Sequence, residues 1–403
     1  MRVKFLAFNV NRHLLSSALA AFVVWAGLAA GGALAADTAV VATVAPDYSS
    51  GAYSLISVDP VGGPRTVRNN LLPTATSDIT VAAFGRHFYR IERYMADAVS
   101  KFDMAAPETP IWQYSTLGSD QSSNPYGLVF VSEQKAYLLR YGTTRAWIVN
   151  PAAATEAEFL IGELNLDSYA DSDGIPEMCG AALAGGKLFI IMQRLDRDNG
   201  WANSNTAYAA VFDVATDTEI ETGLGDADGV KGLPLPVKNP VSIQYLTEDQ
   251  SLYIAGAGQF PSSSSGPTGY EYTGGLVRLD PETYQAVLIL DDGDADNHPF
   301  GAISGLTVVS PTRGYFVGYA GWGDNCLYPF DPSTGSVGPA LAGLEHKNIA
   351  GMESGTYVDK NGRLWVCDQT EAEVVIVNTA DNTVEERVGT NLNPTKVVFC
   401  SDN

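Results

Sequence analysis

The sequence predicts an all-β fold in which one small antiparallel sheet is repeated seven times. A short turn, with an apolar residue followed by Asp or Asn, recurs at intervals of 44, 47, 63, 67, 51 and 47 residues. The Asp or Asn residues are Asp59, Asp103, Asn150, Asp213, Asp280, Asp331 and Asn378. Short β-type runs fill the intervals, without an amphipathic helical pattern. Such a repeat is typical of a β-propeller, so we predict a seven-bladed β-propeller of four-stranded antiparallel blades.

Each repeat contains an apolar strand that follows a turn residue and carries an aromatic side chain. Residues 187–192 are the clearest example. Its counterparts begin at Arg86, Lys135, Ser251, Arg313 and Gly362. In the fourth repeat, residues 181–183, 208–213 and 218–222 complete a set of four strands. We expect the aromatic side chains of these second strands to pack between neighbouring blades.

The two ends of the chain are out of phase with the repeats. Residues 39–44, 52–59 and 66–68 supply three strands at the beginning, and residues 395–399 supply one strand at the end. We expect this last strand to enter the N-terminal blade as its innermost strand. Such a ring closure removes a free sheet edge and joins the two ends.

The seven Asp and Asn residues of the recurring turn have a structural explanation. Their side-chain oxygens can accept a hydrogen bond from the backbone two residues on, and a following Pro fixes φ for a tight turn. We therefore interpret them as turn residues and not as catalytic acids.

Residues 1–35 have the pattern of a secretory signal peptide. Arg2, Lys4 and Arg12 precede the apolar stretch 14–34, and Ala33-Leu34-Ala35 matches a cleavage site. An uncleaved anchor is the alternative, which the small residues at the end of the stretch disfavour. No later apolar run approaches the ~20 residues of a membrane span. We expect an exported chain, periplasmic or extracellular, with residues 36–403 as a single propeller domain and no transmembrane span in the mature chain.

The chain is acidic. Loss of residues 1–35 removes three basic and no acidic residues, which takes the net charge from −22 to −25. This charge argues against nucleic acid and anionic membrane surfaces as partners. Export permits disulfides, and buried free thiols are the alternative. The sequence does not choose between these states for Cys179, Cys326, Cys367 and Cys400.

Insertions in the repeats indicate where binding takes place. Because strand direction alternates, the blade-to-blade connectors and the loops between second and third strands share one face. The long intervals come from insertions at 193–205 and 256–272, and the connectors 167–177 and 223–238 are also long. Long loops on a rigid scaffold commonly carry function, so we expect this face to be the binding surface. Weakly ordered loops without a role are the alternative.

Aromatic and basic residues in these loops are the predicted ligand-binding residues, since exposed Trp, Tyr and Arg are typical anchors of interfaces and pockets. Two tryptophans stand in glycine-rich loops without a strand to bury them. The full set is Tyr126, Arg194, Arg197, Trp201, Tyr270, Tyr272 and Trp322.

One connector has the composition of a calcium loop. Asp167, Asp171, Asp173 and Glu177 surround Gly174, which permits a sharp turn. Ca²⁺ takes several oxygen ligands from flexible loops, so we predict a possible Ca²⁺ site at these four carboxylates. A solvated turn is the alternative, because Asp and Gly are ordinary turn residues.

No motif marks a catalytic centre. His298 and His346 fall in consecutive connectors of the binding face and could serve as a metal or acid–base pair, although ordinary surface histidines are the favoured interpretation. The sequence has no Gly-x-Ser-x-Gly, phosphate-binding loop or His-Glu-x-x-His. We therefore assign no catalytic residue.

Two passages resemble exported YncE-like seven-bladed propellers: Asn124-Pro-Tyr-Gly-Leu-Val-Phe130 at the start of a blade, and Asp280-Pro-Glu-Thr283 after a third strand. A related branch captures cobalamin for an outer-membrane transporter, typically as lipoproteins, and this chain has no Cys at the cleavage point. The resemblance implies an exported binding propeller.

Our hypothesis is a non-enzymatic protein that binds a small cofactor, a metal chelate or a partner protein on the inserted face. That partner would be an envelope protein, for example an outer-membrane transporter. A lactonase- or lyase-like enzyme and a structural subunit of an envelope complex are the alternatives.

Overall fold

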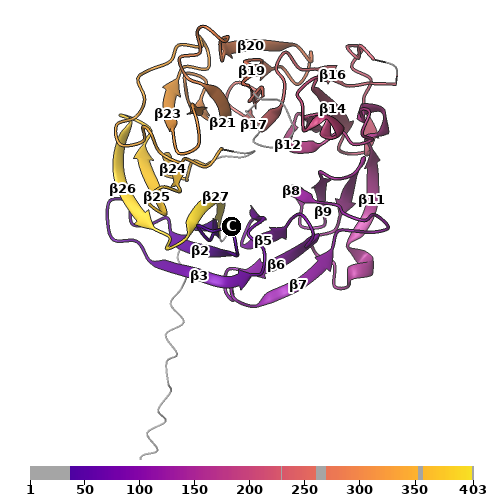
Figure 1. The fold of residues 1–403 in the computed structure, drawn as a ribbon. Coiled ribbons are helices and arrows are strands. Elements are labelled where there is room, and N and C mark those ends of the chain that lie inside the picture. Colours follow the sequence, from indigo (N-terminus) through magenta and orange to yellow (C-terminus); the bar gives the residue numbers. More distant parts are fainter. Residues whose placement is uncertain (1–36, 228, 260–268, 353–356, 402–403) are drawn as a thin grey trace, which may run out of the picture. The chain divides into compact units, whose positions relative to one another are not determined.

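The computed structural model describes residues 37–227, 229–259, 269–352 and 357–401, which form a ring of seven antiparallel sheets (Figure 1). The predicted signal peptide lies outside the described residues. The described residues contain no helix that is long and apolar enough to cross a membrane.

The first three blades have four strands each. Blade 1 is β27 (Asn393–Cys400), β1 (Thr38–Val44), β2 (Gly51–Ser57) and β3 (Val67–Thr74). Blade 2 is β4 (Ile79–Phe84), β5 (His87–Glu92), β6 (Ala98–Asp103) and β7 (Pro110–Ser115). Blade 3 is β8 (Pro125–Ser132), β9 (Lys135–Arg140), β10 (Arg145–Val149) and β11 (Leu160–Asn165).

The next two blades follow the same plan. Blade 4 is β12 (Met178–Ala184), β13 (Lys187–Met192), β14 (Tyr208–Asp213) and the short β15 (Thr218–Glu219), with β16 (Leu233–Pro234) also paired to β14. Blade 5 is β17 (Pro240–Leu246), β18 (Ser251–Gly256), β19 (Gly275–Leu279) and β20 (Ala286–Asp291).

Blades 6 and 7 each have three extended strands plus isolated bridges. Blade 6 is β21 (Ala302–Ser310), β22 (Arg313–Tyr319) and β23 (Asn325–Phe330), and Val337 bridges to Phe330 at the outer position. Blade 7 is β24 (Arg363–Asp368), β25 (Glu373–Asn378) and β26 (Thr383–Gly389). Ile349 and Val358 bridge to β24 at the inner position of this blade. The described helices are single 3₁₀ turns at Glu156–Glu158, Asp167–Tyr169 and Arg197–Asn199.

The predicted ring closure is confirmed. Strand β27 pairs antiparallel with β1 from Thr38↔Cys400 to Val44↔Asn393 and is the innermost strand of blade 1. The last strand of the chain thus completes the first blade, which leaves no gap in the ring between blades 7 and 1 (Figure 1).

The hydrophobic core lies between the blades. The aromatic side chains of the second strands are fully buried, as the sequence predicts, for example Tyr137, Phe189 and Trp365. They pack in clusters that combine residues of adjacent sheets. The described residues contain no disulfide between the four cysteines, of which three are buried and Cys326 is half-buried.

The recurring turn behaves as predicted at most of its copies. Asp103, Asn150, Asp280, Asp331 and Asn378 each accept a backbone N–H from two residues on, at 2.8–3.0 Å. Asp213 accepts the backbone N–H of Thr216 instead, and Asp59 pairs with Lys360. These side chains close turns and are not assembled into a site.

Candidate functional site

The candidate functional site is a cavity of about 880 Å³ shared by blades 2, 3 and 4. Its walls come from blade-to-blade connectors and from the loops between second and third strands, which are the two loop classes that the sequence analysis assigned to the binding face. The wall residues are Asp78, Tyr94, Asp120, Gln121, Ser122, Asn124, Tyr141, Gly142, Thr143, Thr144, Arg145, Gly174, Ile175, Arg197 and Trp201.

The insertion between β13 and β14 brings Trp201 to the cavity. Asp196 caps the 3₁₀ turn Arg197–Asn199 by accepting the backbone N–H of Asn199, and Gly200 follows at φ 67°. Asp196 then pairs with Ala202 in an isolated bridge, which folds the insertion back on itself. Trp201 directly precedes Ala202 in this fold-back and keeps 49% of its surface exposed.

Arg197 ties the insertion to the connector 166–177. Its Nε lies 3.2 Å from Asp173 Oδ2 and 3.2 Å from Glu177 Oε1, and its guanidinium lies 5.6 Å from the centre of the Trp201 ring. Glu177 is wholly buried and also accepts the backbone N–H of Leu195. Burial, followed by the neighbouring carboxylate of Asp173, raises the pKa of Glu177 to about 9.

The four predicted calcium ligands take different partners. Asp167 accepts bonds from Thr144 and Arg145, whereas Asp171 accepts the Asn205 amide at 2.6 Å. Asp173 and Glu177 share the Arg197 guanidinium, which supplies the positive charge between them. Among the described residues, no group of three or more His, Cys, Asp and Glu side chains is arranged for a metal. The Ca²⁺ site at these four carboxylates stays a prediction.

Two other predicted ligand-binding residues support the cavity from behind. Arg194 donates to the carbonyls of Tyr169 and Thr206, which fixes the base of the insertion. Tyr126 stacks on Tyr141 with ring centres 4.9 Å apart, and Tyr141 lines the cavity. Neither Arg194 nor Tyr126 is among the wall residues of the cavity. Their contacts make them positioning residues.

A second cavity, of about 570 Å³, lies on the same face at blades 5 and 6. Tyr270 and Tyr272 line it and stack on each other with ring centres 5.8 Å apart. His298 continues the stack at 4.3 Å from Tyr272, and its Nδ1 lies 2.9 Å from the carbonyl oxygen of Asp294. The structure thus brings the two predicted tyrosines together with one of the two connector histidines.

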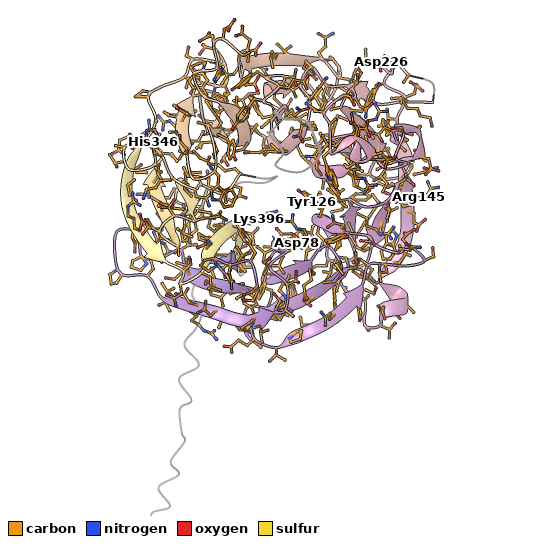
Figure 2. The ribbon with its side chains drawn as sticks, viewed as in Figure 1. Asp78, Tyr126, Arg145, Asp226, His346 and Lys396 are labelled. Carbon is orange, nitrogen blue, oxygen red and sulfur yellow. The ribbon has the colours of Figure 1, made fainter. Side chains whose placement is uncertain are left out.

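His346 lies at the other wall of the second cavity. Its Nδ1 is 2.6 Å from Asp324 Oδ1, which orients the ring, and Cys326 lines the cavity nearby. Figure 2 shows His346 on the opposite side of the ring from Arg145. The connector histidines therefore share a cavity, which the sequence suggested only from their order along the chain.

Trp322 contacts neither cavity wall. Its ring lies 6.5 Å from that of Tyr48, and 73% of its surface is exposed. This tryptophan is exposed, as predicted. It does not line either cavity with the other predicted ligand-binding residues.

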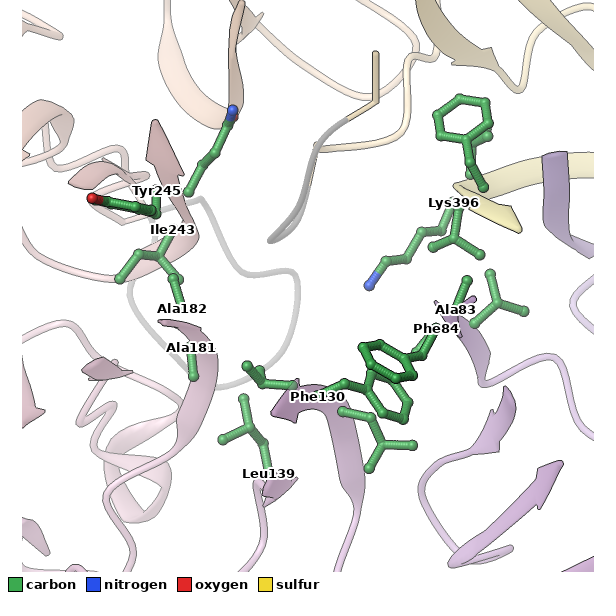
Figure 3. A pocket seen from close by; sticks show the side chains of 18 of the residues that line it. Ala83, Phe84, Phe130, Leu139, Ala181, Ala182, Ile243, Tyr245 and Lys396 are labelled. Carbon is green, nitrogen blue, oxygen red and sulfur yellow. The ribbon is translucent and has the colours of Figure 1, made fainter. Parts of the chain in front are cut away.

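The central channel is a separate space of about 440 Å³ that is lined mainly by apolar side chains of the innermost strands (Figure 3). Phe84 and Phe130 stack there with ring centres 5.1 Å apart, and the Lys396 side chain extends into the opening. Neither His298 nor His346 is part of this lining. The channel wall thus offers little acid–base chemistry.

Sequence reasoning missed most of the wall of the first cavity. Tyr94, Asn124 and Arg145 come from blades 2 and 3, whose loops carry no insertion. Loop length therefore indicated one side of the cavity only. The short loops 93–97 and 141–144 also join second and third strands, as the long insertion does. This shared position in the blade could have indicated that they line the same cavity.

Comparison with known proteins identifies the fold and no family. No protein-family model and no curated protein match the chain. A protein provisionally assigned as a 6-phosphogluconolactonase from Bacteroides uniformis matches with a TM-score of 0.59 and 11% identity, covering 90% of this chain and 99% of that chain. A streptogramin B lyase structure matches with a TM-score of 0.51 and 13% identity, covering 88% and 87%.

Apo AztD from Citrobacter koseri matches with a TM-score of 0.50 and 13% identity, covering 91% of this chain and 98% of that chain. This chain has the same propeller fold as these proteins. The fold expected from the resemblance to YncE-like propellers is confirmed. At identities of 11–13%, the ligands and activities of these proteins cannot be assigned to this chain. Its function must therefore be argued from the site itself.

Proposed function

We propose that the protein is an exported, non-enzymatic propeller that binds a small molecule in the cavity shared by blades 2, 3 and 4. The observation that carries this proposal is the cavity itself, with the half-exposed Trp201 on its wall. A volume of about 880 Å³ falls within the ~300–1,000 Å³ of small-molecule sites.

The cavity is also built to stay in shape. Its loops are fixed by the Arg197 contacts to Asp173 and Glu177 and by the Arg194 contacts to two backbone carbonyls. A pre-formed site avoids part of the entropy cost of ordering loops on binding.

Export and a partner belong to the same proposal. A cleaved signal peptide would carry the protein out of the cytoplasm, where an envelope protein such as an outer-membrane transporter would receive the bound molecule. A calcium ion at Asp167, Asp171, Asp173 and Glu177 stays a separate prediction, and its binding would require Arg197 to leave Asp173 and Glu177.

Native mass spectrometry of the exported protein, purified without chelator, tests the proposal. We expect a bound small molecule that is lost in Trp201→Ala and kept in Trp322→Ala, because only Trp201 lines the cavity. A ligand that remains in Trp201→Ala contradicts this site, and loss of the ligand from both variants points to the whole face instead of the cavity.

A second candidate function is a lactonase- or lyase-like activity in the second cavity. The observation that favours it is the pair formed by His346 and Asp324 at 2.6 Å, since a carboxylate that holds Nδ1 leaves Nε2 to act as a base. Turnover of a lactone panel that falls at least ~100-fold in His346→Ala would support it. Turnover that survives both His298→Ala and His346→Ala would remove this mechanism.

A further inference from the structure

The charged side chains at the wall of the first cavity already have partners within the protein. Each of the four lies within 3.2 Å of an opposite charge. The pairs are Asp78–Arg93 at 2.7 Å, Asp120–Arg140 at 2.5 Å, Arg145–Asp167 at 2.7 Å and Arg197–Asp173 at 3.2 Å. The wall therefore carries two compensated carboxylates and two compensated cations. A ligand with a net charge would find no unbalanced charge of opposite sign among these side chains.

Three hydroxyl groups of the wall are available to a ligand as hydrogen-bond acceptors. The Thr144 hydroxyl donates to Asp167 at 2.5 Å, and the Tyr141 hydroxyl donates to Gln193 at 2.7 Å. The Ser122 hydroxyl donates to Asp97 at 3.4 Å. Each of these oxygens has used its only proton and keeps lone pairs for a ligand.

Two further polar atoms belong to residues of the same wall. Asn124 Oδ1 and Arg145 Nη1 are buried and have no hydrogen-bond partner among the described residues. Such unmet groups cost free energy, which a bound hydroxyl or an ordered water between wall and ligand would recover. The cavity thus offers several acceptors and at least one donor. A neutral ligand that donates several hydrogen bonds would match these acceptors.

An aromatic platform completes the wall. Trp201 is half-exposed, and the Arg197 guanidinium lies 5.6 Å from its ring centre. Tyr94, which is 58% exposed, supplies a second aromatic ring at the wall. Aromatic rings bind flat apolar surfaces, including the C–H face of a sugar ring, while hydroxyl groups around that face reach polar neighbours.

We infer that the ligand of this cavity is a neutral saccharide. The inference rests on the proposed function and adds the chemical class of the ligand. A sugar ring has one apolar face for Trp201 and several hydroxyl donors for Ser122, Tyr141 and Thr144, and it carries no charge that the compensated ion pairs would fail to match. A planar aromatic ligand would stack equally well but would leave most of these acceptors unused.

Isothermal titration with neutral di- and trisaccharides of glucose, galactose, mannose and N-acetylglucosamine tests the inference. We expect saturable binding of at least one of them, with the same affinity at 50 and 500 mM NaCl because a neutral ligand is not screened. Trp201→Ala should weaken this binding by at least about tenfold, and Trp201→Phe by less. Trp322→Ala serves as the matched control, because this tryptophan is exposed on the same face but does not line the cavity.

Different results of these experiments would contradict the ligand class, the binding site or both. Binding of no saccharide, together with native mass spectrometry that finds another molecule lost in Trp201→Ala, overturns the saccharide and leaves the proposed function standing. Saccharide binding that persists in both Trp201→Ala and Trp201→Phe overturns the inference for this cavity. The absence of any bound or titrated ligand contradicts both proposals.

Discussion

Glu177 is the residue whose surroundings differ most from those of an ordinary carboxylate. It is wholly buried, with Arg197 on one oxygen and the backbone of Leu195 on the other. Burial raises its pKa from 4.5 to about 9, so the folded protein holds a proton there that the unfolded chain releases above pH 4.5.

This shift predicts a pH dependence of stability. The free energy of unfolding falls as the pH rises between about 4.5 and 9. Over this range the unfolded state releases the Glu177 proton and is thereby stabilised relative to the folded state. In Glu177→Gln the fall between pH 6 and pH 9 should be smaller, since an amide does not titrate. A smaller dependence remains from Asp292, whose pKa burial raises to about 7. Urea unfolding at several pH values measures both.

Glu371→Gln is the control for this prediction. Glu371 is exposed and its hydrogen bond from Lys347 lowers its pKa, so it is charged above pH 6 in both states. The same pH dependence in Glu177→Gln as in the unmodified protein would contradict a proton on Glu177.

At the scale of elements, the insertion between β13 and β14 is held in place by one arginine. Arg197 joins the insertion to the Asp173 carboxylate and to the protonated carboxyl group of Glu177, and the side chains of Asp173 and Glu177 are 4% and 0% exposed. Removal of the Arg197 guanidinium would leave Asp173 and Glu177 buried with fewer polar partners, which is unfavourable.

Arg197→Gln should therefore lower the free energy of unfolding by ~2 kcal/mol, somewhat below the ~3–5 kcal/mol of a fully buried pair because Arg197 keeps some solvent contact. Because protonated Glu177 carries no charge at pH 7, the expected loss is nearly the same in a Glu177→Gln background, and a double-mutant cycle in urea measures the difference.

Arg145→Gln provides the comparison. Arg145 also lines the cavity but pairs with the exposed Asp167, so its loss should cost less than ~1 kcal/mol. Equal losses for Arg197→Gln and Arg145→Gln would show that burial of the acidic partners is not what fixes the insertion.

At the scale of the whole molecule, the ring depends on its last strand. β27 pairs with β1 along its length and supplies Val397, which packs in the core cluster shared with blade 7. An open ring would expose the edge of β1 and the apolar faces of two blades.

Truncation after Asn391 should therefore abolish the cooperative unfolding transition or cause aggregation, whereas removal of residues 402–403 should leave both unchanged. Size-exclusion chromatography and thermal unfolding measure these outcomes. A monomeric truncated protein with an unchanged transition would mean that closure contributes little to stability.

Much of the fold could be predicted because it depends on local patterns. The turn residues Asp280 and Asp331 bond their own backbone, and second-strand aromatics such as Tyr137 occupy equivalent buried places in successive blades. Alternation of strand direction then assigns each loop to a face. From these features alone follow the seven blades, the ring closure and the face that holds both cavities.

The tertiary structure decided which side chains of that face meet. Sequence spacing suggested Asp173 and Glu177 as calcium ligands, yet the fold places Arg197, about 20 residues away, between them. It also completes the wall around Trp201 with Arg145 from the start of β10 in another blade. Local propensities determine strands and turns, whereas a cavity shared by three blades depends on distances between loops far apart in the chain, which no local pattern encodes.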